Sequence, residues 1–350
     1  MSRISEIDKN FAVKSANDME DTIYINACDS SLEINGVFYE DGKFRRLPEA
    51  VAKEVSWGVF VLSGHTAGGR LRFKTDSSYV ILKATLGEIG KMPHFALTGS
   101  AGFDLYVKEE NAQKYTGTFV PAFDITDTID GIVGFGYNKE REITINFPLY
   151  SEVKELYIGL QKTAKISAPT PYNNEKPVVF YGSSITQGGC ASRAGTSYQG
   201  FISRRLNMDY INLGFSGNAK GEDAMAEYIK NLDMSAFVYD YDHNAPDTEH
   251  LKATHEKMFK AVREANPAIP IIIMSRPQFN LTADEEKRLE IIKETYNNAV
   301  NSGDNNVYLL TGKELMALAE NEGTVDNCHP TDFGFASIAK ALGDLLEKIL

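Results

Sequence analysis

The sequence predicts an α/β protein in which a three-layer α/β/α domain with a parallel five-stranded sheet follows an all-β, jelly-roll-like sandwich. Two observations support this fold class. Up to about residue 165, apolar residues alternate with polar ones, and this period of two is typical of half-buried strands. Beyond residue 177, short apolar runs are separated by segments with helical periodicity, which is the pattern of a parallel sheet covered by helices.

The strands of the first half are predicted from four groups of alternating apolar residues. These residues are Leu71 and Phe73; Phe103, Leu105 and Val107; Ile143, Ile145 and Phe147; and Leu156, Ile158 and Leu160. Because successive side chains of a strand point to opposite faces, each strand should bury these residues and expose the polar ones between them, such as Arg70 and Arg72. The Asp41-Gly42 pair predicts a two-residue hairpin turn.

Five short apolar runs predict the strands of the parallel sheet in the second half. They are Val178–Tyr181, Tyr210–Leu213, Ala236–Tyr239, Ile269–Met274 and Val307–Leu310. The last helix is predicted from apolar residues between Phe335 and Ile349 that are spaced to form one buried face. In an open α/β sheet the active site lies at the carboxyl ends of the strands, so we expect functional residues just after these runs.

A segment between the two patterns predicts the domain boundary. Residues 163–177 contain three prolines and two asparagines and show neither periodicity, as is typical of a connection. We therefore predict a β-sandwich accessory domain at residues 1–165, a linker at 166–176 and the α/β domain at 177–350. The length of 350 residues also fits two domains of the usual size, roughly 100–200 residues each.

Charge and cysteine content narrow the class of partner. The formal net charge is −12, from 36 Lys and Arg against 48 Asp and Glu, which argues against nucleic acid or an anionic membrane surface as the main partner. A neutral substrate fits better. Three cysteines without paired ligand spacing predict neither a disulfide scaffold nor a zinc module. Since no apolar leader and no membrane-length apolar run is found, we expect a cytoplasmic protein.

A serine follows the first predicted strand of the parallel sheet. That strand ends in a turn of small residues at 182–186, Gly-Ser-Ser-Ile-Thr, and a helix is predicted from about Ser197 to Leu206. In such a turn Ser184 would expose its Oγ as a nucleophile and aim its own N–H at a developing oxyanion. On this segment alone, a plain tight turn is an equal interpretation. The G-x-S-x-G elbow is absent because its fifth position is Thr186, and no Lys follows the glycines at P-loop spacing.

A carboxylate and an imidazole stand three residues apart just before the last helix. Asp326 and His329 can meet across one loop turn, where Asp326 accepts the Nδ1–H of His329 and Nε2 takes a proton from a serine. In the structural alternative, Asp326 caps the last helix and His329 packs beside Pro330. With Ser184 at the edge of the same sheet, the pair favours a Ser-His-Asp triad.

Four segments, in this order, resemble the sequence blocks of the SGNH (GDSL-like) serine esterase family. They are residues 182–186, residues 212–217 (Asn-Leu-Gly-Phe-Ser-Gly), residues 242–244 (Asp-His-Asn) and residues 326–330 (Asp-Asn-Cys-His-Pro). The resemblance implies an esterase whose triad is Ser184, His329 and Asp326 and which needs no metal or cofactor. It also implies an oxyanion hole made by the N–H groups of Ser184 and Gly217 and the side chain of Asn244.

Two positions depart from the family pattern. Ser183 stands where the family usually has an Asp before the nucleophile, and this removes a carboxylate that braces the loop. The third block reads Asp-His-Asn-Ala at 242–245 instead of Gly-x-Asn-Asp, so the neighbours of Asn244 differ from the usual ones. Gly217 and Asn244 still follow predicted strands, which lets both reach the same edge of the sheet.

The first half resembles the β-sandwich of a two-domain bacterial branch of this family. The similar segments are residues 46–48 (Arg-Leu-Pro), 70–73 (Arg-Leu-Arg-Phe), 92–94 (Met-Pro-His), 102–106 (Gly-Phe-Asp-Leu-Tyr) and 148–150 (Pro-Leu-Tyr). The resemblance implies a small-molecule or oligosaccharide ester as substrate, with a short O-acyl group such as acetyl on a carbohydrate. Two alternatives stay open: an acyltransferase with the same triad, and a carbohydrate-binding protein without catalytic activity.

Further residues could lie near this site. His94 and His243 either line the substrate pocket or are ordinary packed or solvated histidines. Cys190 and Cys328 should both fall near the triad, and a disulfide between them is a hypothesis. The single tryptophan, Trp57, is expected in the core of the sandwich rather than as a platform for a sugar.

Overall fold

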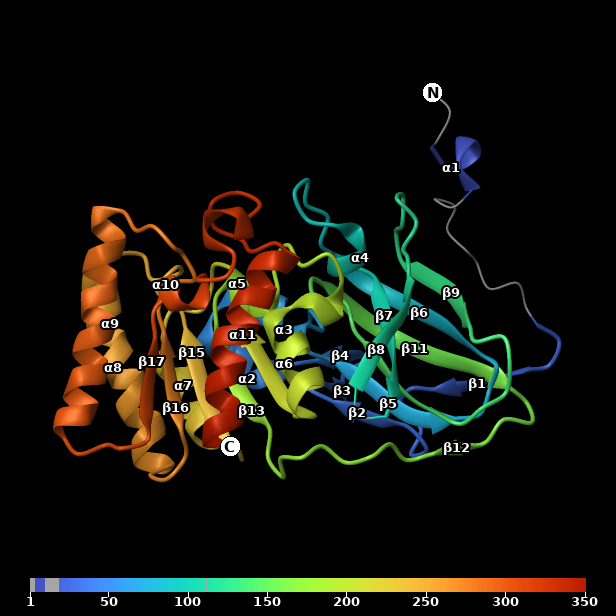
Figure 1. Cartoon of the computed structure of the whole chain (residues 1–350), viewed down its shortest axis with the longest axis horizontal. Coiled ribbons are helices and arrows are strands. Elements are labelled where there is room, and N and C mark those ends of the chain that lie inside the picture. Colours follow the sequence, from blue (N-terminus) through green and yellow to red (C-terminus); the bar gives the residue numbers. More distant parts are fainter. Residues whose placement is uncertain (1–3, 10–18, 111) are drawn as a thin grey trace.

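A computed structural model of the protein describes residues 4–9, 19–110 and 112–350. The predicted sandwich domain starts at residue 1, so residues 1–3, 10–18 and 111 of it lie outside the described residues. The molecule is elongated, with an α/β part at one end and a β-rich part at the other (Figure 1). A short helix, α1 (Ile4–Ile7), precedes the β-rich part.

A five-stranded parallel sheet forms the centre of the α/β part. Its strands have the spatial order β14 (Tyr210–Gly214), β13 (Val178–Gly182), β15 (Ala236–Asp240), β16 (Ile271–Met274) and β17 (Val307–Leu310). Every residue of β13, β15 and β16 is buried, which explains why these strands read as continuous apolar runs. The predicted parallel sheet is therefore confirmed.

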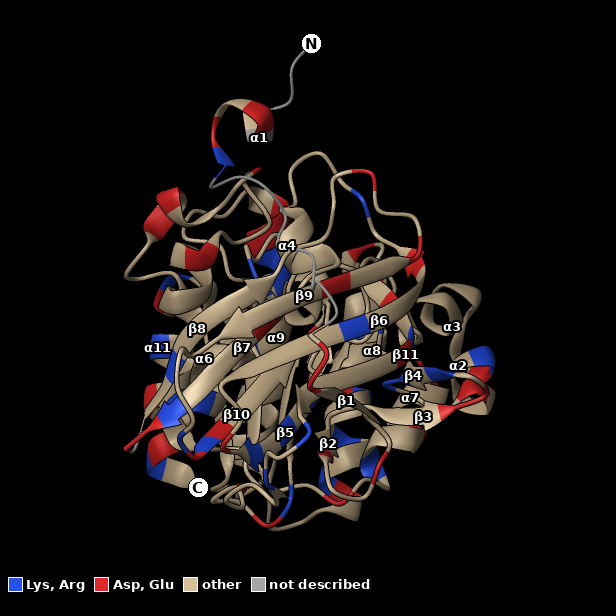
Figure 2. Ribbon diagram, turned by 90° about the vertical axis from the view of Figure 1, so that its right-hand side faces the viewer, with Lys and Arg blue, Asp and Glu red and all other residues tan. Residues whose placement is uncertain are grey.

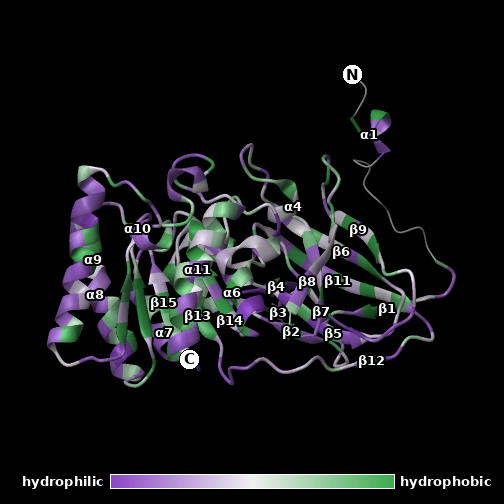
Figure 3. Cartoon of the chain, in the orientation of Figure 1, coloured by the Kyte–Doolittle hydropathy of each residue, from purple (hydrophilic) through white to green (hydrophobic). Residues whose placement is uncertain are grey.

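Helices cover both faces of this sheet and complete the three layers. They are α5 (Ser184–Gln187), α6 (Tyr198–Leu206), α7 (Asp223–Lys230), α8 (Thr248–Ala265), α9 (Ala283–Asn301), α10 (Gly312–Leu315) and α11 (Asp332–Ile349). Val178 of β13 shares one hydrophobic core with α6 and α11, whereas Val179 shares the other with α7, α8 and α9. The strands beside α8 and α9 are coloured mainly as hydrophobic, and these two helices alternate between hydrophilic and hydrophobic residues (Figure 3). Among the described residues, no helix has the length and hydrophobicity to cross a bilayer.

Two antiparallel sheets form the β-rich part. One has the order β1 (Thr22–Asn26), β11 (Ser151–Gln161), β6 (Tyr79–Ile89) and β9 (Thr128–Gly134). The other has the order β12 (Ile166–Ser167), β5 (Arg70–Thr75), β10 (Arg141–Asn146), β7 (Phe103–Glu109) and β8 (Ala112–Phe119), and β2 (Glu33–Asn35) also pairs with β5. Leu71, Ile145 and Leu105 stand side by side across three strands and are fully buried between the sheets. The predicted sandwich is confirmed.

The stretch between β2 and β5 contains helices that the alternating pattern did not predict. β3 (Phe38–Glu40) and β4 (Lys43–Arg45) form the expected hairpin, in which Asp41 and Gly42 have φ values of 49° and 83°. Positive φ at both turn residues is what a tight hairpin requires. Two helices follow, α2 (Glu49–Val55) and α3 (Trp57–Ser63), and a third, α4 (Leu97–Ser100), precedes β7.

Helices α2 and α3 pack on the parallel sheet rather than on the sandwich. Ala52 and Val59 are fully buried in the same hydrophobic core as Val179 of β13. Trp57, the first residue of α3, is 78% exposed, so its expected position in the sandwich core is wrong. Helices α2 and α3 lie where the first half of the chain packs against the second. Their contacts with the parallel sheet determine their structure, although the alternating pattern of the first half predicts strands.

The second face of β5 is buried, which corrects the expectation that its polar residues face water. Figure 2 shows basic residues on β5, yet Arg70 and Arg72 are only 2% and 0% exposed. The guanidinium of Arg70 lies 3.8 Å from the ring centre of Tyr210 in β14, and that of Arg72 lies 3.7 Å from the ring centre of Tyr172. Because the α/β part and the connecting segment cover this face, the arginines stack on aromatic rings instead of being solvated.

The predicted linker, residues 166–176, is held against both parts of the molecule. Its β12 pairs with β5, while the Asn173 N–H donates to the carbonyl of Asn207 at 2.8 Å. The division of the chain into domains at 165 and 177 stays a prediction, since Ala52 and Val59 already belong to a core of the second half.

Arg46 joins the first half of the chain to the end of β14. It is 2% exposed, and its guanidinium donates to the carbonyl oxygens of Leu62 and His65 at 2.7 and 2.6 Å. It also donates to the carbonyl oxygens of Asn212 and Gly214 at 2.9 and 2.7 Å. A buried cation is tolerated here because four oriented carbonyl groups replace its hydration.

Replacing Arg46 tests this connection. Arg46→Ala should lower the free energy of unfolding by roughly 3–5 kcal/mol, because four buried carbonyls lose a charged donor. Urea unfolding would measure the loss, with Lys53→Ala as the control, since Lys53 is 58% exposed and should change stability by less than about 0.5 kcal/mol. Equal stability of the two variants would contradict the role given to Arg46.

Candidate active site

Ser184 stands in a tight turn at the carboxyl end of β13. The strand ends at Gly182, and Ser184 is the first residue of α5 and 8% exposed. The Oγ of Ser183 accepts a hydrogen bond from the N–H of Ile185 at 3.2 Å, which caps the short helix. Gly188 ends the helix with φ of 99°, a left-handed conformation that favours glycine. The turn thus fixes Ser184 at the sheet edge where an active site is expected.

The structure brings the three predicted triad residues together. Ser184 Oγ lies 2.9 Å from Nε2 of His329, and Nδ1 of His329 lies 2.8 Å from Oδ2 of Asp326. Asp326 Oδ1 also accepts the backbone N–H of His329 at 2.7 Å. Asn327, with φ of 68°, allows the loop to turn back on itself so that the carboxylate meets the ring. With the proton of His329 on Nδ1, Nε2 is free to accept the serine proton.

The surroundings of Asp326 keep it ionised. Partial burial alone would raise the pKa of this carboxyl, but the hydrogen bonds from the side chain and backbone of His329 outweigh burial and lower the pKa below its ordinary value. A permanent carboxylate at this position orients the ring of His329 and would stabilise the imidazolium after proton transfer.

The two further residues implied for an oxyanion hole lie on neighbouring loops. The Nδ2 of Asn244 donates to the carbonyl of Phe215 at 3.1 Å, and the N–H of Phe215 donates to the carbonyl of Gly182 at 2.8 Å. These bonds tie the loop that carries Gly217 both to the nucleophile turn and to Asn244. Gly217 has φ of 68°, and no atom lies within 4 Å of where its Cβ would be, so the space above it is open. Their role in stabilising an oxyanion stays a prediction.

A carboxylate that sequence reasoning missed braces the nucleophile turn. Ser183 does replace the family's usual Asp, but Asp240, at the end of β15, takes over the contact. Its Oδ1 accepts the N–H of Ser183 at 3.2 Å and the hydroxyl of Thr186 at 2.8 Å. Its Oδ2 is buried without a partner, and burial raises the pKa of Asp240 to about 7. Position 183 lacks the family's carboxylate, and Asp240 braces the turn from the neighbouring strand; a carboxylate ending that strand was the available signal.

The sandwich part contributes two side chains to this site. His94 Nε2 lies 3.8 Å from Oδ2 of Asp326, and its ring centre lies 5.9 Å from that of His329. The hydroxyl of Tyr150 donates to the carbonyl of Ser184 at 3.2 Å. Burial raises the pKa of Tyr150, so this hydroxyl keeps its proton and remains a donor. His94 was a candidate from the sequence; Tyr150 lay in a segment recognised only as similar to the family.

Two aspartates hold the loop that follows the nucleophile helix. Asp104 of β7 is fully buried and accepts the N–H of Gly195 at 2.9 Å. Asp332, the first residue of α11, accepts the N–H of Ser192 and the hydroxyl of Thr196, both at 2.8 Å. The loop is thus fixed to the sandwich on one side and to the helix after His329 on the other.

His243 and the two nearby cysteines surround the loop of His329. His243 Nδ1 lies 3.8 Å from Sγ of Cys328, and burial followed by the charge of Arg276 keeps the pKa of His243 well below its ordinary value. Cys190 and Cys328 are free thiols, so the hypothetical disulfide between them is not formed in this structure. Burial raises the pKa of Cys190 to about 12 and that of Cys328 to about 11, which argues against a thiol nucleophile.

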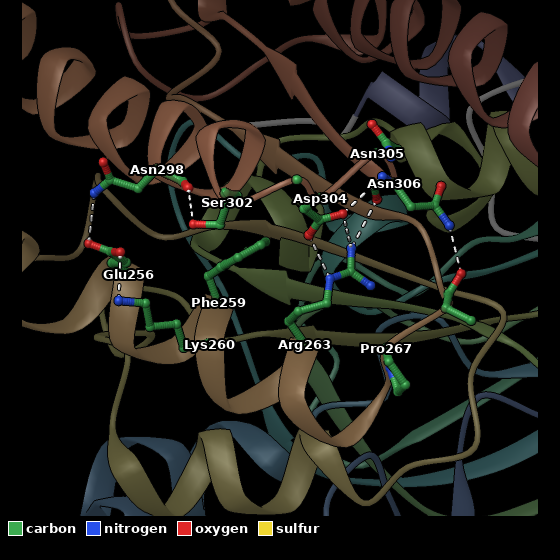
Figure 4. A pocket seen from close by; sticks show the side chains of 13 residues that line it. Glu256, Phe259, Lys260, Arg263, Pro267, Asn298, Ser302, Asp304, Asn305 and Asn306 are labelled. Carbon is green, nitrogen blue, oxygen red and sulfur yellow. Dashed lines mark hydrogen bonds and ion pairs between the residues drawn. The ribbon is translucent and has the colours of Figure 1, made fainter.

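A surface hollow of about 720 Å³ lies elsewhere, between α8 and the segment that leads into β17 (Figure 4). Its two cationic side chains are already paired, Arg263 with Asp304 at 2.7 Å and Lys260 with Glu256 at 2.8 Å. Asn306 of its lining directly precedes β17, so the hollow opens at the amino ends of the strands. Ser184 lies at the opposite edge of the sheet, after the carboxyl end of β13.

Comparisons with known protein families cover almost the whole chain. The model of the GDSL-like lipase/acylhydrolase family matches residues 175–347. A second model, described as the N-terminus of SGNH-hydrolase-type esterases, matches residues 22–166. No curated protein sequence matches the chain.

Several solved structures have a similar fold over nearly their whole length. Three of them are described as proteins with different activities. A GDSL-like lipase from Bacteroides ovatus is 27% identical, with a TM-score of 0.83 over 94% of this chain and 98% of its own. The salicylyl-acyltransferase SsfX3 from a tetracycline biosynthetic pathway is 18% identical, with a TM-score of 0.74 over 95% and 99%. A family two carbohydrate esterase from Clostridium thermocellum, solved with cellohexaose, is 15% identical, with a TM-score of 0.61 over 91% and 98%.

Asp240 should make stability depend on pH. Its pKa rises from an ordinary value of 3.8 to about 7 on folding, so the folded state binds the proton more tightly. The stabilising contribution is complete below about pH 4 and is lost as pH rises through 7. Asp240→Asn, which mimics the protonated acid, should therefore gain stability relative to the unaltered protein between pH 5 and 8, as measured by urea unfolding.

The control for this prediction is Asp233→Asn, because the side chain of Asp233 is 86% exposed. This variant should follow the pH dependence of the unaltered protein. The same pH dependence in Asp240→Asn would show that Asp240 does not titrate in this range.

Proposed function

Because the chain belongs to the GDSL-like lipase/acylhydrolase family, a family of esterases, we propose that it hydrolyses O-acyl esters through a triad of Ser184, His329 and Asp326. One observation carries this assignment: an unbroken line of hydrogen bonds, 2.9 Å from Ser184 to His329 and 2.8 Å from His329 to Asp326. This is the geometry that a serine nucleophile and its general base require.

The reaction proceeds through an acyl-enzyme. Ser184 Oγ attacks the ester carbonyl while its proton moves to Nε2 of His329, and the resulting imidazolium is stabilised by Asp326. Collapse of the tetrahedral intermediate breaks the bond to the alcohol oxygen, which takes the proton from His329. Water, deprotonated by His329, then attacks the acyl group and releases the acid and free Ser184. No step needs a metal or a cofactor.

The oxyanion of both tetrahedral intermediates would be bound by the N–H groups of Ser184 and Gly217 and by the second amide hydrogen of Asn244. Asn244 donates one hydrogen to Phe215, which leaves the other available. Each such donor is worth roughly 2.7–4 kcal/mol of barrier. The open space above Gly217 leaves room for the substrate carbonyl.

We assign a short acyl group, acetyl in particular, carried by a carbohydrate. The turn beside the nucleophile is closely packed, since a Cβ on Gly189 would lie 3.0 Å from Tyr150 Oη and 3.3 Å from His329 Cδ2. We further propose that His94, whose side chain is 42% exposed, and His243 contact the alcohol part of the substrate. The carbohydrate esterase of Clostridium thermocellum, with its bound cellohexaose, supports a sugar by analogy of fold alone.

Removing triad residues tests the assignment directly. Ser184→Ala should abolish hydrolysis of p-nitrophenyl acetate, and Asp326→Asn should lower kcat by about 10⁴-fold, as the corresponding change does in serine proteases. Ser302→Ala is the control, because this serine is exposed at the end of α9, away from the carboxyl ends of the strands. Unimpaired hydrolysis by folded Ser184→Ala protein would rule out the mechanism.

A substrate series tests the acyl length and the acceptor. We expect kcat/KM to fall from acetyl to butyryl to octanoyl p-nitrophenyl esters and acetylated sugars to be deacetylated, because the turn beside Ser184 is closely packed. Products should be analysed with and without added sugar acceptor. Acyl transfer that exceeds hydrolysis at dilute acceptor would make the protein an acyltransferase, the activity described for the structurally similar SsfX3.

A further inference from the structure

A cluster of side chains beside Ser184 joins His329 to two further possible metal ligands that do not belong to the proposed triad. One ligand atom each of His94, Cys190 and His329 lies within 4.8 Å of the other two. Two imidazoles and a thiolate form a donor set that Zn²⁺ prefers. We propose that this cluster binds Zn²⁺, or a similar thiophilic divalent cation, and that the bound cation inhibits the enzyme by occupying His329.

The three ligands come from separate segments that meet only in the folded protein. His94 lies between β6 and α4, Cys190 follows α5, and His329 precedes α11. Cys190 has φ of 74° in a turn held by the bond from the Gly189 N–H to the Ser184 carbonyl, at 2.8 Å. The position of its thiol is therefore set by the same turn that positions the nucleophile.

The spacing is close to what a bound cation needs. Zinc lies about 2.0–2.3 Å from nitrogen and sulfur ligands, so the donors must move inward by less than about 1 Å. Water would take the fourth position of a tetrahedral site. Because the side chain of His94 is 42% exposed, the cation can reach the cluster from solvent.

Binding and catalysis compete for the same imidazole. On binding, the Cys190 thiol releases its proton to solvent and the thiolate coordinates the cation. A ring nitrogen of His329 donates its lone pair to the cation, so the ring is drawn out of the relay between Ser184 and Asp326. Inhibition rests on the proposed function of His329, whereas binding rests only on the geometry of the cluster.

Cobalt and zinc titrations test the two parts separately. Cobalt chloride added to the full-length protein should give a thiolate-to-Co²⁺ charge-transfer absorption, which Cys190→Ser should abolish and which His94→Gln should weaken. Zinc chloride should inhibit hydrolysis at a concentration roughly 10- to 100-fold lower for the unaltered protein than for Cys190→Ser, each normalised to its own zinc-free rate. Cys28→Ser, which alters an exposed thiol elsewhere, should behave as the unaltered protein does.

Two spectroscopic results would overturn the proposed binding site: no charge-transfer band in the unaltered protein, or an undiminished band in Cys190→Ser. Should Cys190→Ser fail to fold, His94→Gln tests the same cluster. Ser184→Ala separates this proposal from the assignment of esterase activity, because it should bind cobalt with the same absorption although it does not hydrolyse esters. If zinc inhibited hydrolysis equally in the unaltered protein and in folded Cys190→Ser, the proposed inhibition through this cluster would be wrong.

Discussion

The hydrogen bond between Ser184 and His329 joins residues 145 positions apart, and the surrounding structure holds the two atoms at 2.9 Å. Misplacement by about 1 Å can cost roughly 10²-fold in rate, so both loops must be fixed. Asp240 holds the nucleophile turn from the end of β15, while Asp332 ties the loop after α5 to the helix that follows His329. The relative position of Ser184 and His329 therefore depends on two carboxylates that bond the backbone around them.

The sandwich is part of this arrangement rather than a module attached to it. The hydroxyl of Tyr150 donates to the carbonyl of Ser184, and the carboxylate of Asp104 accepts the N–H of Gly195. The imidazole of His94 lies near the carboxylate of Asp326. Arg46 connects the same half of the chain to the end of β14. Movement of the sandwich relative to the parallel sheet would therefore disturb the nucleophile turn, which explains why the two parts share a buried, charged interface.

The parallel sheet and the contact between Asp326 and His329 were predictable because their signals are local. Strands buried on both faces read as apolar runs, and Asp326 and His329 are three residues apart. Features that depend on how the two parts meet were not predictable: the burial of Arg70 and Arg72, the helices α2 and α3, and the exposure of Trp57. The role of Asp240 was not predicted because this residue ends the neighbouring strand. It is far from Ser183 in the sequence, so no local pattern indicates their contact.

The most direct test of the central claim is mass spectrometry after treatment with a fluorophosphonate, which reacts with a serine activated by a neighbouring base. A single adduct on Ser184, lost when His329 is replaced by Ala, is the result that this account predicts. An adduct on Ser183 or Ser216 instead, or labelling of Ser184 that persists without His329, would contradict it.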